Sequence, residues 1–313
     1  MFLTSAFRQT SILLSAMLLG SALWGFFRIP GDNLLVVVFT FLFSALLAGT
    51  SPFTDRLRLA LTFAVYSATA QFLISVLFQF PFWQIILSSA FAYLAFSTLP
   101  DLRAGCVVMI IGYLSYFAPH DFHSAVSRSI DIFIGVIIIM LVTTLCEINS
   151  KKDVGNNFSP CSGCRALVLA TQLAAGNLIF QMFRLRQGAW IMLTILFITM
   201  SESSKAPAEK LALQRIFAVP AGIMLGGFLL ETFCRIDYRL VYLVPFLGAI
   251  GFFFLYNDGN FFIFSLFFML TLTVFSDWMT GPYHRFHFWD TLFSRTAASL
   301  LGALLVLTDR RTA

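Results

Sequence analysis

One stretch of this chain constrains its fold more than any other. Between Lys210 and Glu231 runs LALQRIFAVPAGIMLGGFLL, twenty residues with a single charged side chain, Arg215. A helix of this length rises about 30 Å, which matches the hydrocarbon core of a bilayer. An arginine inside such a helix costs a few kcal/mol on insertion scales, so it needs a partner or a task. The sequence therefore predicts a membrane-spanning helix organised around a buried cation.

An arginine followed seven residues later by a glycine occurs three times. Seven residues are almost two helical turns, so both positions share one face of a helix, about 10 Å apart along its axis. A neighbouring helix packs closely on the glycine, next to the charge. The three pairs are Arg128 and Gly135, Arg215 and Gly222, and Arg295 and Gly302. We expect the glycines to be helix-packing positions and the arginines to lie inside a bundle.

The composition indicates an integral membrane protein. Of the 313 residues, 59% are hydrophobic and 11% are charged, against about 25% charged residues in soluble domains. The apolar runs are continuous rather than alternating, which favours helices over a barrel. The net charge of +5 gives no reason to expect a nucleic-acid partner, because basic residues in membrane proteins usually record topology. The predicted fold is an all-α, polytopic membrane helix bundle.

Apolar runs predict about twelve transmembrane helices, divided by one polar linker. The linker, 149–165, has two lysines near its start, Lys151 and Lys152, and contains Gly, Asn, Ser and Pro. It separates a first six-helix membrane repeat, 1–148, from a second, 166–313. The predicted spans are 9–27, 33–50, 57–79, 82–99, 104–119, 126–146, 166–183, 188–201, 209–231, 239–256, 260–276 and 288–308.

Landmarks recur in the same order on both sides of the linker, which predicts a duplication. Six spans per copy is an even number, so the copies are expected to be related by a pseudo-two-fold axis along the membrane normal. All four lysines fall on the side of the N-terminus, so both termini are expected in the cytoplasm. The paired landmarks are Arg8 and Arg165, Phe27-Arg28 and Phe183-Arg184, Ser51-Pro52 and Ala206-Pro207, His120/His123 and His284/His287, and Arg128/Gly135 and Arg295/Gly302.

The three arginines are candidate ligands for an organic anion. A guanidinium is always charged, and its planar fork of donors fits a carboxylate. Two interpretations stay open for each arginine: contact with an anionic substrate, or a structural role beside an internal acid or at the membrane interface. Arg215 is the strongest candidate for substrate contact, because no acid lies within four residues of it inside its helix. Arg128, by contrast, has Asp131 three residues away on the same face.

Acidic and histidine side chains supply candidates for proton coupling. Asp131 lies further inside an apolar run than any other acid, a position typical of proton relays, and a salt bridge to Arg128 explains it equally well. Histidine titrates near physiological pH, so His123 and His287 are also proton-coupling candidates. The histidines with their nearby aspartates also match a metal site. Tight interfacial turns explain them more simply, so we predict no metal, no cofactor and no catalytic residue.

These residues resemble the fusaric acid resistance (FUSC) and aromatic acid exporter family. That family shows a Trp-rich Leu-Thr helix and then an Arg-x-x-Gly-Thr-x-x-Gly helix; Ala218 and Val219 replace the inner Gly-Thr here. A family helix with the pattern Arg-x-x-Asp-Thr-x-x-Gly is matched by the sixth span, with Ile132 in place of the Thr. The matching residues are Trp190, Leu193-Thr194, Arg215 and Gly222, then Arg128, Asp131 and Gly135, and more loosely Arg295 and Gly302.

The resemblance implies an inner-membrane exporter of aromatic or related organic acids, often working with a periplasmic adaptor protein. Plant malate-type anion channels, which pair as dimers, are similar in layout. We therefore predict a proton-coupled secondary transporter in the inner (plasma) membrane that exports small, aromatic organic acids. Expected partners are the substrate anion, the lipid bilayer, an adaptor protein and further copies of the chain. The expected substrate contacts are Arg215, Arg128, Arg295 and Trp190.

Three alternatives stay open at this point. A passive organic-anion channel would use the same arginines without needing a proton gradient. A membrane-embedded metalloenzyme would use the histidines and the nearby aspartates. An accessory subunit would have no flux of its own.

Overall fold

A computed structural model describes residues 11, 14–15, 53–117, 120–147, 161–185, 187–202, 207–236, 247–248, 250–251, 253–254, 260–279 and 288–309. Within these ranges the protein contains nine α-helices, two short 3-10 turns and no β-strand. The predicted all-α fold class is therefore confirmed. By their contacts the described residues form two compact units: an N-terminal unit within Ser11–Gln181, and a C-terminal unit whose described residues lie within Met182–Ala313.

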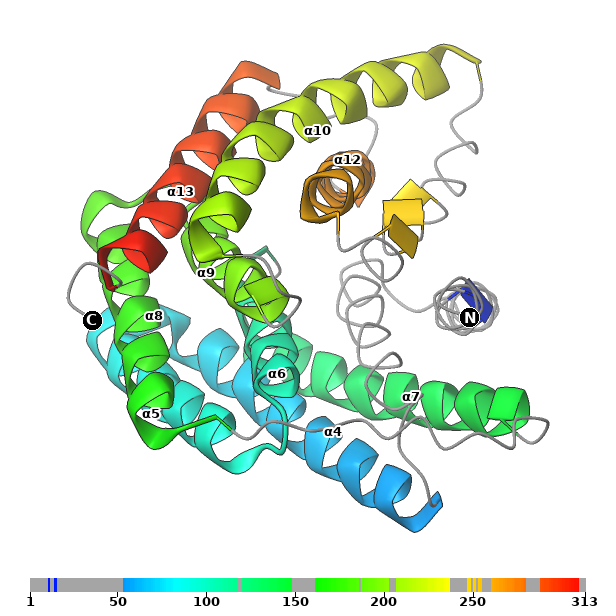
Figure 1. Ribbon diagram of the computed structural model, residues 1–313, viewed down its shortest axis with the longest axis vertical. Helices are drawn as coiled ribbons and strands as arrows, with labels where there is room; N and C mark the ends of the chain where they lie inside the picture. The colour runs from blue at the N-terminus through cyan, green and yellow to red at the C-terminus, as the bar shows by residue number, and fades with distance from the viewer. Residues whose placement is uncertain are drawn as a thin grey trace. The chain divides into compact units, whose positions relative to one another are not determined.

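The N-terminal unit is organised around α4 (Phe53–Val76), which packs against α5, α6 and α7. Figure 1 shows α4 in blue crossing the green α7. The alanine-rich buried face of α4, which includes Ala60, Ala64 and Ala68, lets its neighbours approach closely. Its other elements are η2 (Leu77–Gln79), α5 (Pro81–Thr98), α6 (Leu102–Leu114), η3 (Ser115–Phe117), α7 (Phe122–Glu147) and α8 (Gly163–Phe183).

Helix α8 joins the N-terminal unit through buried polar side chains. Asn177 accepts a hydrogen bond from the Tyr116 hydroxyl at 2.9 Å, and Gln181 donates to Gln84 at 2.7 Å. Gln84 in turn donates to the carbonyl of Ile74 at 3.0 Å. These bonds satisfy amides that would otherwise be stranded in an apolar interior. These bonds explain why α8 groups with the helices before the linker. A division by contacts does not test a division by repeated sequence, so the repeat boundary at 149–165 stays a prediction.

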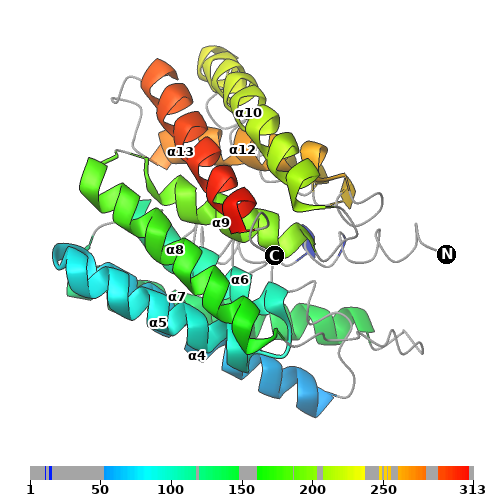
Figure 2. The ribbon, with the colours of Figure 1, turned by 60° about the vertical axis from the view of Figure 1, so that its left-hand side comes forward.

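The C-terminal unit contains α9 (Ala189–Glu202), α10 (Ala208–Ile236), α12 (Phe261–Met279) and α13 (Phe288–Asp309). α10 packs against both α12 and α13, and α13 also packs against α9. Figures 1 and 2 show α10 and α13 side by side from two directions. The four helices thus enclose a core to which each contributes one face.

The two units share a pattern of packing. In the N-terminal unit α4 packs on α6 and α7, and in the C-terminal unit α10 packs on α12 and α13. Helix α4 follows Pro52 and packs on α6 and α7, the last two helices before the linker. Helix α10 follows Pro207 and packs on α12 and α13, the last two described helices of the chain. This pattern supports the duplication, although the arrangement of twelve helices in two repeats stays a prediction.

Five of the described helices are long and apolar enough to cross a membrane. They are Phe53–Gln79, Phe122–Leu145, Gly163–Phe183, Ala208–Thr232 and Trp289–Thr308. The predicted spans 104–119, 188–201 and 260–276 correspond to shorter apolar helices, Leu102–Phe117, Ala189–Ser201 and Phe261–Val274. The predicted spans 9–27, 33–50 and 239–256 lie mostly outside the described residues.

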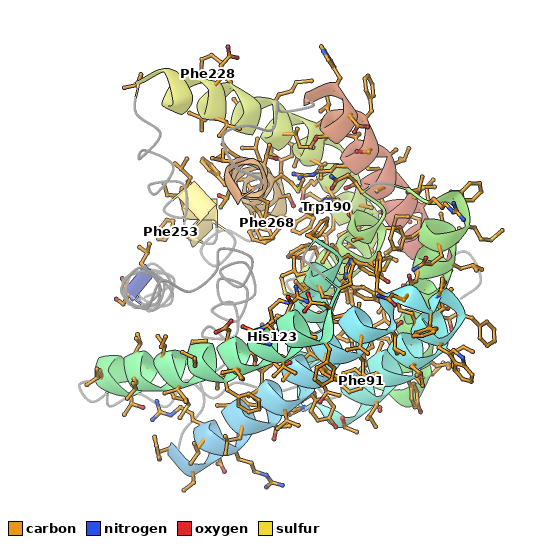
Figure 3. All side chains as sticks on the ribbon, turned by 180° about the vertical axis from the view of Figure 1, so that it is seen from behind. Phe91, His123, Trp190, Phe228, Phe253 and Phe268 are labelled. Atoms are coloured by element: carbon orange, nitrogen blue, oxygen red, sulfur yellow. The ribbon has the colours of Figure 1, made fainter. Side chains whose placement is uncertain are left out.

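Large apolar side chains cover the outer faces of the long helices. Phe228 on α10 is 68% exposed and points outward in Figure 3. Phe293 on α13 and Leu145 on α7 are exposed to the same degree, at 67% each. Water would penalise such surfaces, whereas lipid tails accept them. The faces agree with the bilayer environment that the composition predicts.

Glycines set the distance between α10 and α12, and between α13 and α9. A Cβ atom built on Gly222 would lie 2.6 Å from the carbonyl oxygen of Leu266 and 2.8 Å from Cβ of Met269. A Cβ atom on Gly302 would lie 2.5 Å from the carbonyl oxygen of Ile191. Backbone atoms cannot move away as a flexible side chain can. The third predicted packing glycine, Gly135, is buried on α7.

We expect Gly222→Ala to lower the stability of the protein by about 1–3 kcal/mol, because its methyl group would push α10 away from α12. The measurement is the unfolding temperature of the purified protein in detergent micelles. Gly163→Ala is the matched control, since the nearest atom to its Cβ would be the Tyr93 hydroxyl at 3.9 Å. Equal unfolding temperatures for the two variants would show that the glycine contact does not limit helix packing.

Candidate anion-binding site

Arg215 lies in the middle of the C-terminal unit and is completely buried. The apolar periodicity of α10 turns the face that carries Arg215 and Gly222 toward α12. Its guanidinium carbon sits 4.9 Å from the centre of the Phe197 ring on α9. Its Nη2 faces Met269 Sδ on α12 at 3.8 Å, a weak acceptor. Three helices therefore surround one cation.

The contacts of Arg215 are neutral. Among the described residues, no hydrogen-bond acceptor reaches its Nε or Nη1. By contrast, Arg103 in the N-terminal unit forms an ion pair with Asp101 at 2.8 Å. A buried guanidinium whose contacts among the described residues are a thioether and an aromatic ring attracts an anion strongly, because the low dielectric around it leaves its charge unscreened.

A cluster of aromatic side chains, Phe197, Phe264 and Phe268, lies next to the guanidinium of Arg215. The Phe197 ring meets the Phe268 ring edge-on, with centroids 4.7 Å apart, and the Phe264 ring at 6.1 Å. Phe264 and Phe268 also contact each other, at 5.5 Å. Figure 3 labels Phe268 and Trp190, which both belong to this unit. The arrangement places a cation at the edge of an aromatic cluster, where a ring and a carboxylate on one ligand would both find partners.

Arg295 on α13 forms the centre of a second cluster in the same unit. It is 3% exposed, and its guanidinium lies over the Trp190 ring at 5.2 Å. Its Nη1 donates to Thr273 Oγ1 on α12 at 3.2 Å, and its Nε donates to Gln187 Oε1 at 3.4 Å. Trp190 Nε1 donates to the same Gln187 oxygen at 3.1 Å.

Helix α12 links the two arginines. Met269, which faces Arg215, and Thr273, which faces Arg295, are four residues apart on one face of α12, about 6 Å along its axis. The close approach of α10 and α12 at Gly222 and Gly226 brings this face within reach of α10. The structure thus places Arg215, Arg295 and Trp190 around the core of one unit.

The motif residues of α9 form its contact with α13. Thr194 and Ser299 share a hydrogen bond at 3.2 Å, one turn along α9 from Trp190. Gly302 packs against Ile191 and Thr194 just below them. The Leu-Thr pattern of the sequence therefore corresponds to a helix contact that holds Trp190 under Arg295.

Arg128 and Asp131 lie on α7 in the N-terminal unit. Both are buried, and Arg128 Nη2 donates to Ser75 Oγ on α4 at 2.7 Å. A site that combines Arg128 with the arginines of the C-terminal unit stays a prediction, as does proton coupling through Asp131.

The histidines divide into two groups. His120 stacks on Phe78 with ring centroids 3.5 Å apart. Burial, and then the nearby Arg128 guanidinium, lower the pKa of His120 from 6.5 to about 4, so its imidazole is neutral at physiological pH. His123 is exposed near the start of α7. His284 and His287 lie outside the described residues; in the described part, no three His, Cys, Asp or Glu side chains come close enough to hold a metal.

Several residues of these clusters carry no signal in the sequence. Met269 and Phe197 stand in apolar runs and look like ordinary packing residues. Gln187 lies in a short polar turn, and Thr273 is one of several threonines in α12. Only the crossing of separate helices brings them to the arginines.

The long apolar helices, their exposed aromatic faces and the cations inside them define a multi-spanning membrane protein. Residues 173–308 match the model of a family described as fusaric acid resistance protein-like (FUSC_2). The predicted resemblance to the fusaric acid resistance family is confirmed over this stretch, which contains Trp190, Arg215 and Arg295. The match and the apolar helices together support a membrane protein of the transport or efflux class. No curated protein and no solved structure matched the chain.

We expect Arg215→Met to raise the unfolding temperature of the protein in detergent. The substitution keeps the length of the side chain and removes a buried charge that the described residues do not neutralise, a change that often stabilises by about 1–4 kcal/mol. Arg295→Met is the comparison and should lower it, because Gln187 and Thr273 would each lose one hydrogen bond. A fall in the unfolding temperature of Arg215→Met would mean that the guanidinium is structural.

Proposed function

We propose that the protein is a secondary transporter that exports small, aromatic organic acids, with Arg215 as the main contact for the substrate carboxylate. The observation that carries the proposal is the complete burial of the Arg215 guanidinium among neutral groups. Retaining such a cation lowers stability, and an anionic substrate explains why it is retained.

The substrate carboxylate would replace the weak contact with Met269. A carboxylate accepts two parallel hydrogen bonds from a guanidinium fork, whereas the thioether accepts one weak bond. The ion pair would contribute about 4 kcal/mol at 4 Å for an effective dielectric constant of about 20. Once Nη2 leaves Met269, it can form a bidentate edge with either Nε or Nη1, and both of these atoms face no acceptor among the described residues.

The aromatic ring of the substrate would lie against Phe197, Phe268 and Trp190. Offset or edge-on contacts between rings contribute about 0.5–1.5 kcal/mol beyond the burial of their area. Arg295, whose guanidinium lies over the Trp190 ring, stays a further candidate contact for the substrate. We therefore expect benzoate-like acids to bind more tightly than aliphatic acids of equal charge.

Proton coupling is assigned to Asp131, in keeping with its burial on α7. An acid buried inside an apolar helix occupies a position typical of proton relays. His123 and His287 stay candidates for proton entry. The proposed location is the inner membrane with both termini in the cytoplasm, and the proposed partners are a periplasmic adaptor protein and further copies of the chain.

Transport of radiolabelled benzoate into proteoliposomes tests the role of Arg215. We expect Arg215→Met to lower the uptake rate at least 100-fold, because the loss of a bidentate ion pair in a dry site costs several kcal/mol. Arg58→Met is the control, since Arg58 is exposed at the start of α4 and its loss should leave uptake unchanged. Uptake by Arg215→Met at the natural rate would exclude Arg215 from the site.

A second transport experiment separates coupled transport from a passive channel. We expect Asp131→Asn to abolish benzoate uptake driven by a pH gradient while leaving benzoate exchange intact, because exchange needs no net proton movement. The control is the natural protein with the gradient collapsed. Flux that follows the membrane potential equally well with and without the gradient would identify a channel and remove Asp131 from the mechanism.

A further inference from the structure

Ser265 on α12 carries a buried hydroxyl that the proposed function has not used. The side chain is completely buried, and its Oγ meets no hydrogen-bond partner among the described residues. Other helical hydroxyls of this protein donate to the carbonyl four residues earlier, as Thr271 does to Phe267 at 2.8 Å and Thr232 does to Phe228 at 2.8 Å. Ser265 does not use this ordinary partner. A hydroxyl left unsatisfied in an apolar interior lowers stability, so its presence calls for an explanation.

Helix geometry turns Ser265 toward Arg215. At about 100° per residue, Ser265 lies on the surface of α12 between Phe268 and Met269, about 60° from the first and about 40° from the second. Met269 Sδ faces the Arg215 guanidinium at 3.8 Å. Phe268, labelled in Figure 3, contacts the Phe197 ring over which the same guanidinium lies. Ser265 therefore belongs to the side of α12 on which Arg215 lies, between α9 and α10.

The side chain of Met269 extends over the turn that contains Ser265. The two residues are four positions apart, or about 6 Å along the helix axis. Long side chains in a helix point back toward its N-terminus and cover the preceding turn, so the thioether of Met269 lies over the turn of Ser265. The proposed substrate carboxylate replaces this thioether at Arg215. A carboxylate in that position would also lie next to the Ser265 hydroxyl.

A carboxylate bound by Arg215 alone would still lack donors. Its two oxygens offer about four lone-pair sites, and one bidentate edge of a guanidinium occupies two of them. In an apolar interior the remaining sites need donors of their own. The O–H of Ser265 is such a donor, and it adds a hydrogen bond without changing the charge of the site.

We propose that Ser265 is a second ligand for the substrate carboxylate. Its O–H donates to a carboxylate oxygen whose other lone pair accepts from the Arg215 fork, once the substrate has displaced the Met269 thioether. The ligand class is a small aromatic carboxylate, and the inference rests on the proposed function. The unsatisfied hydroxyl and the unpaired donor atoms of Arg215 thus have one explanation, which is a ligand that satisfies both.

The test uses Ser265→Ala in the full-length protein, purified in detergent, with benzoate as the probe. We expect the dissociation constant for benzoate, measured by calorimetry, to rise at least about tenfold, because a hydrogen bond to a charged group is lost. Without benzoate, the unfolding temperature should stay equal or rise, because the hydroxyl has no partner among the described residues. A purely structural role for Ser265 would lower the unfolding temperature instead.

Two further variants complete the test. Ser115→Ala is the matched control, because Ser115 is also completely buried, lies in the N-terminal unit and donates to the Gly112 carbonyl at 2.6 Å. It should lower the unfolding temperature and bind benzoate normally. Ser265→Cys nearly keeps the size of the side chain and replaces the hydroxyl with a weak donor, so it should weaken benzoate binding at least about threefold.

The outcomes separate this inference from the proposed function. A loss of benzoate affinity smaller than about tenfold in Ser265→Ala would overturn the role of Ser265 and leave Arg215 in place as the site. A fall in unfolding temperature as large as that of Ser115→Ala would also overturn it, since the hydroxyl would then hold the fold. Benzoate binding that is absent from the natural protein, or unchanged in Arg215→Met, would overturn the proposed function itself. If Ser265→Ala does not fold, Ser265→Cys decides, and a loss smaller than about threefold overturns the role of Ser265.

Discussion

The interaction on which this structure depends is the contact between a buried guanidinium and groups that carry no charge. A cation inside an apolar bundle needs compensation, and ion pairs are the usual solution. Around Arg215 the described residues supply a thioether and an aromatic ring. The described groups around Arg215 therefore keep a positive charge in place without neutralising it, which lowers stability and attracts an anion.

The helices around Arg215 make this arrangement possible. Gly222 and Gly226 bring α10 onto α12, and Gly302 brings α13 onto α9. Arg215 on α10 and Arg295 on α13 both contact side chains of α12, Met269 and Thr273 respectively. The turn before α9 then supplies Gln187, whose single oxygen organises Trp190 and Arg295 together. Packing between helices and preparation of the site are thus the same set of contacts.

Each unit buries polar side chains among apolar helices. In the N-terminal unit, Tyr116, Asn177, Gln84 and Gln181 form hydrogen bonds with one another across α5, η3 and α8, as expected of groups that join helices in an apolar medium. In the C-terminal unit, Arg215 has donor atoms that face no acceptor among the described residues. The family match covers all of α9, α10 and α12, and α13 as far as residue 308. The part of the chain that resembles known resistance proteins is therefore the part that contains this cation.

The sequence by itself determined the features that are local along a helix. The length and apolarity of 211–230, and the seven-residue spacing of Arg215 and Gly222, follow from helix geometry alone. The tertiary structure decided which groups meet the arginines, since Met269 lies 54 residues from Arg215 and Gln187 lies 108 residues from Arg295. Residues on one helix have a fixed spatial relation, whereas contacts between helices depend on where the helices cross. For that reason a buried cation was predictable from the sequence, but the neutral character of its surroundings was not.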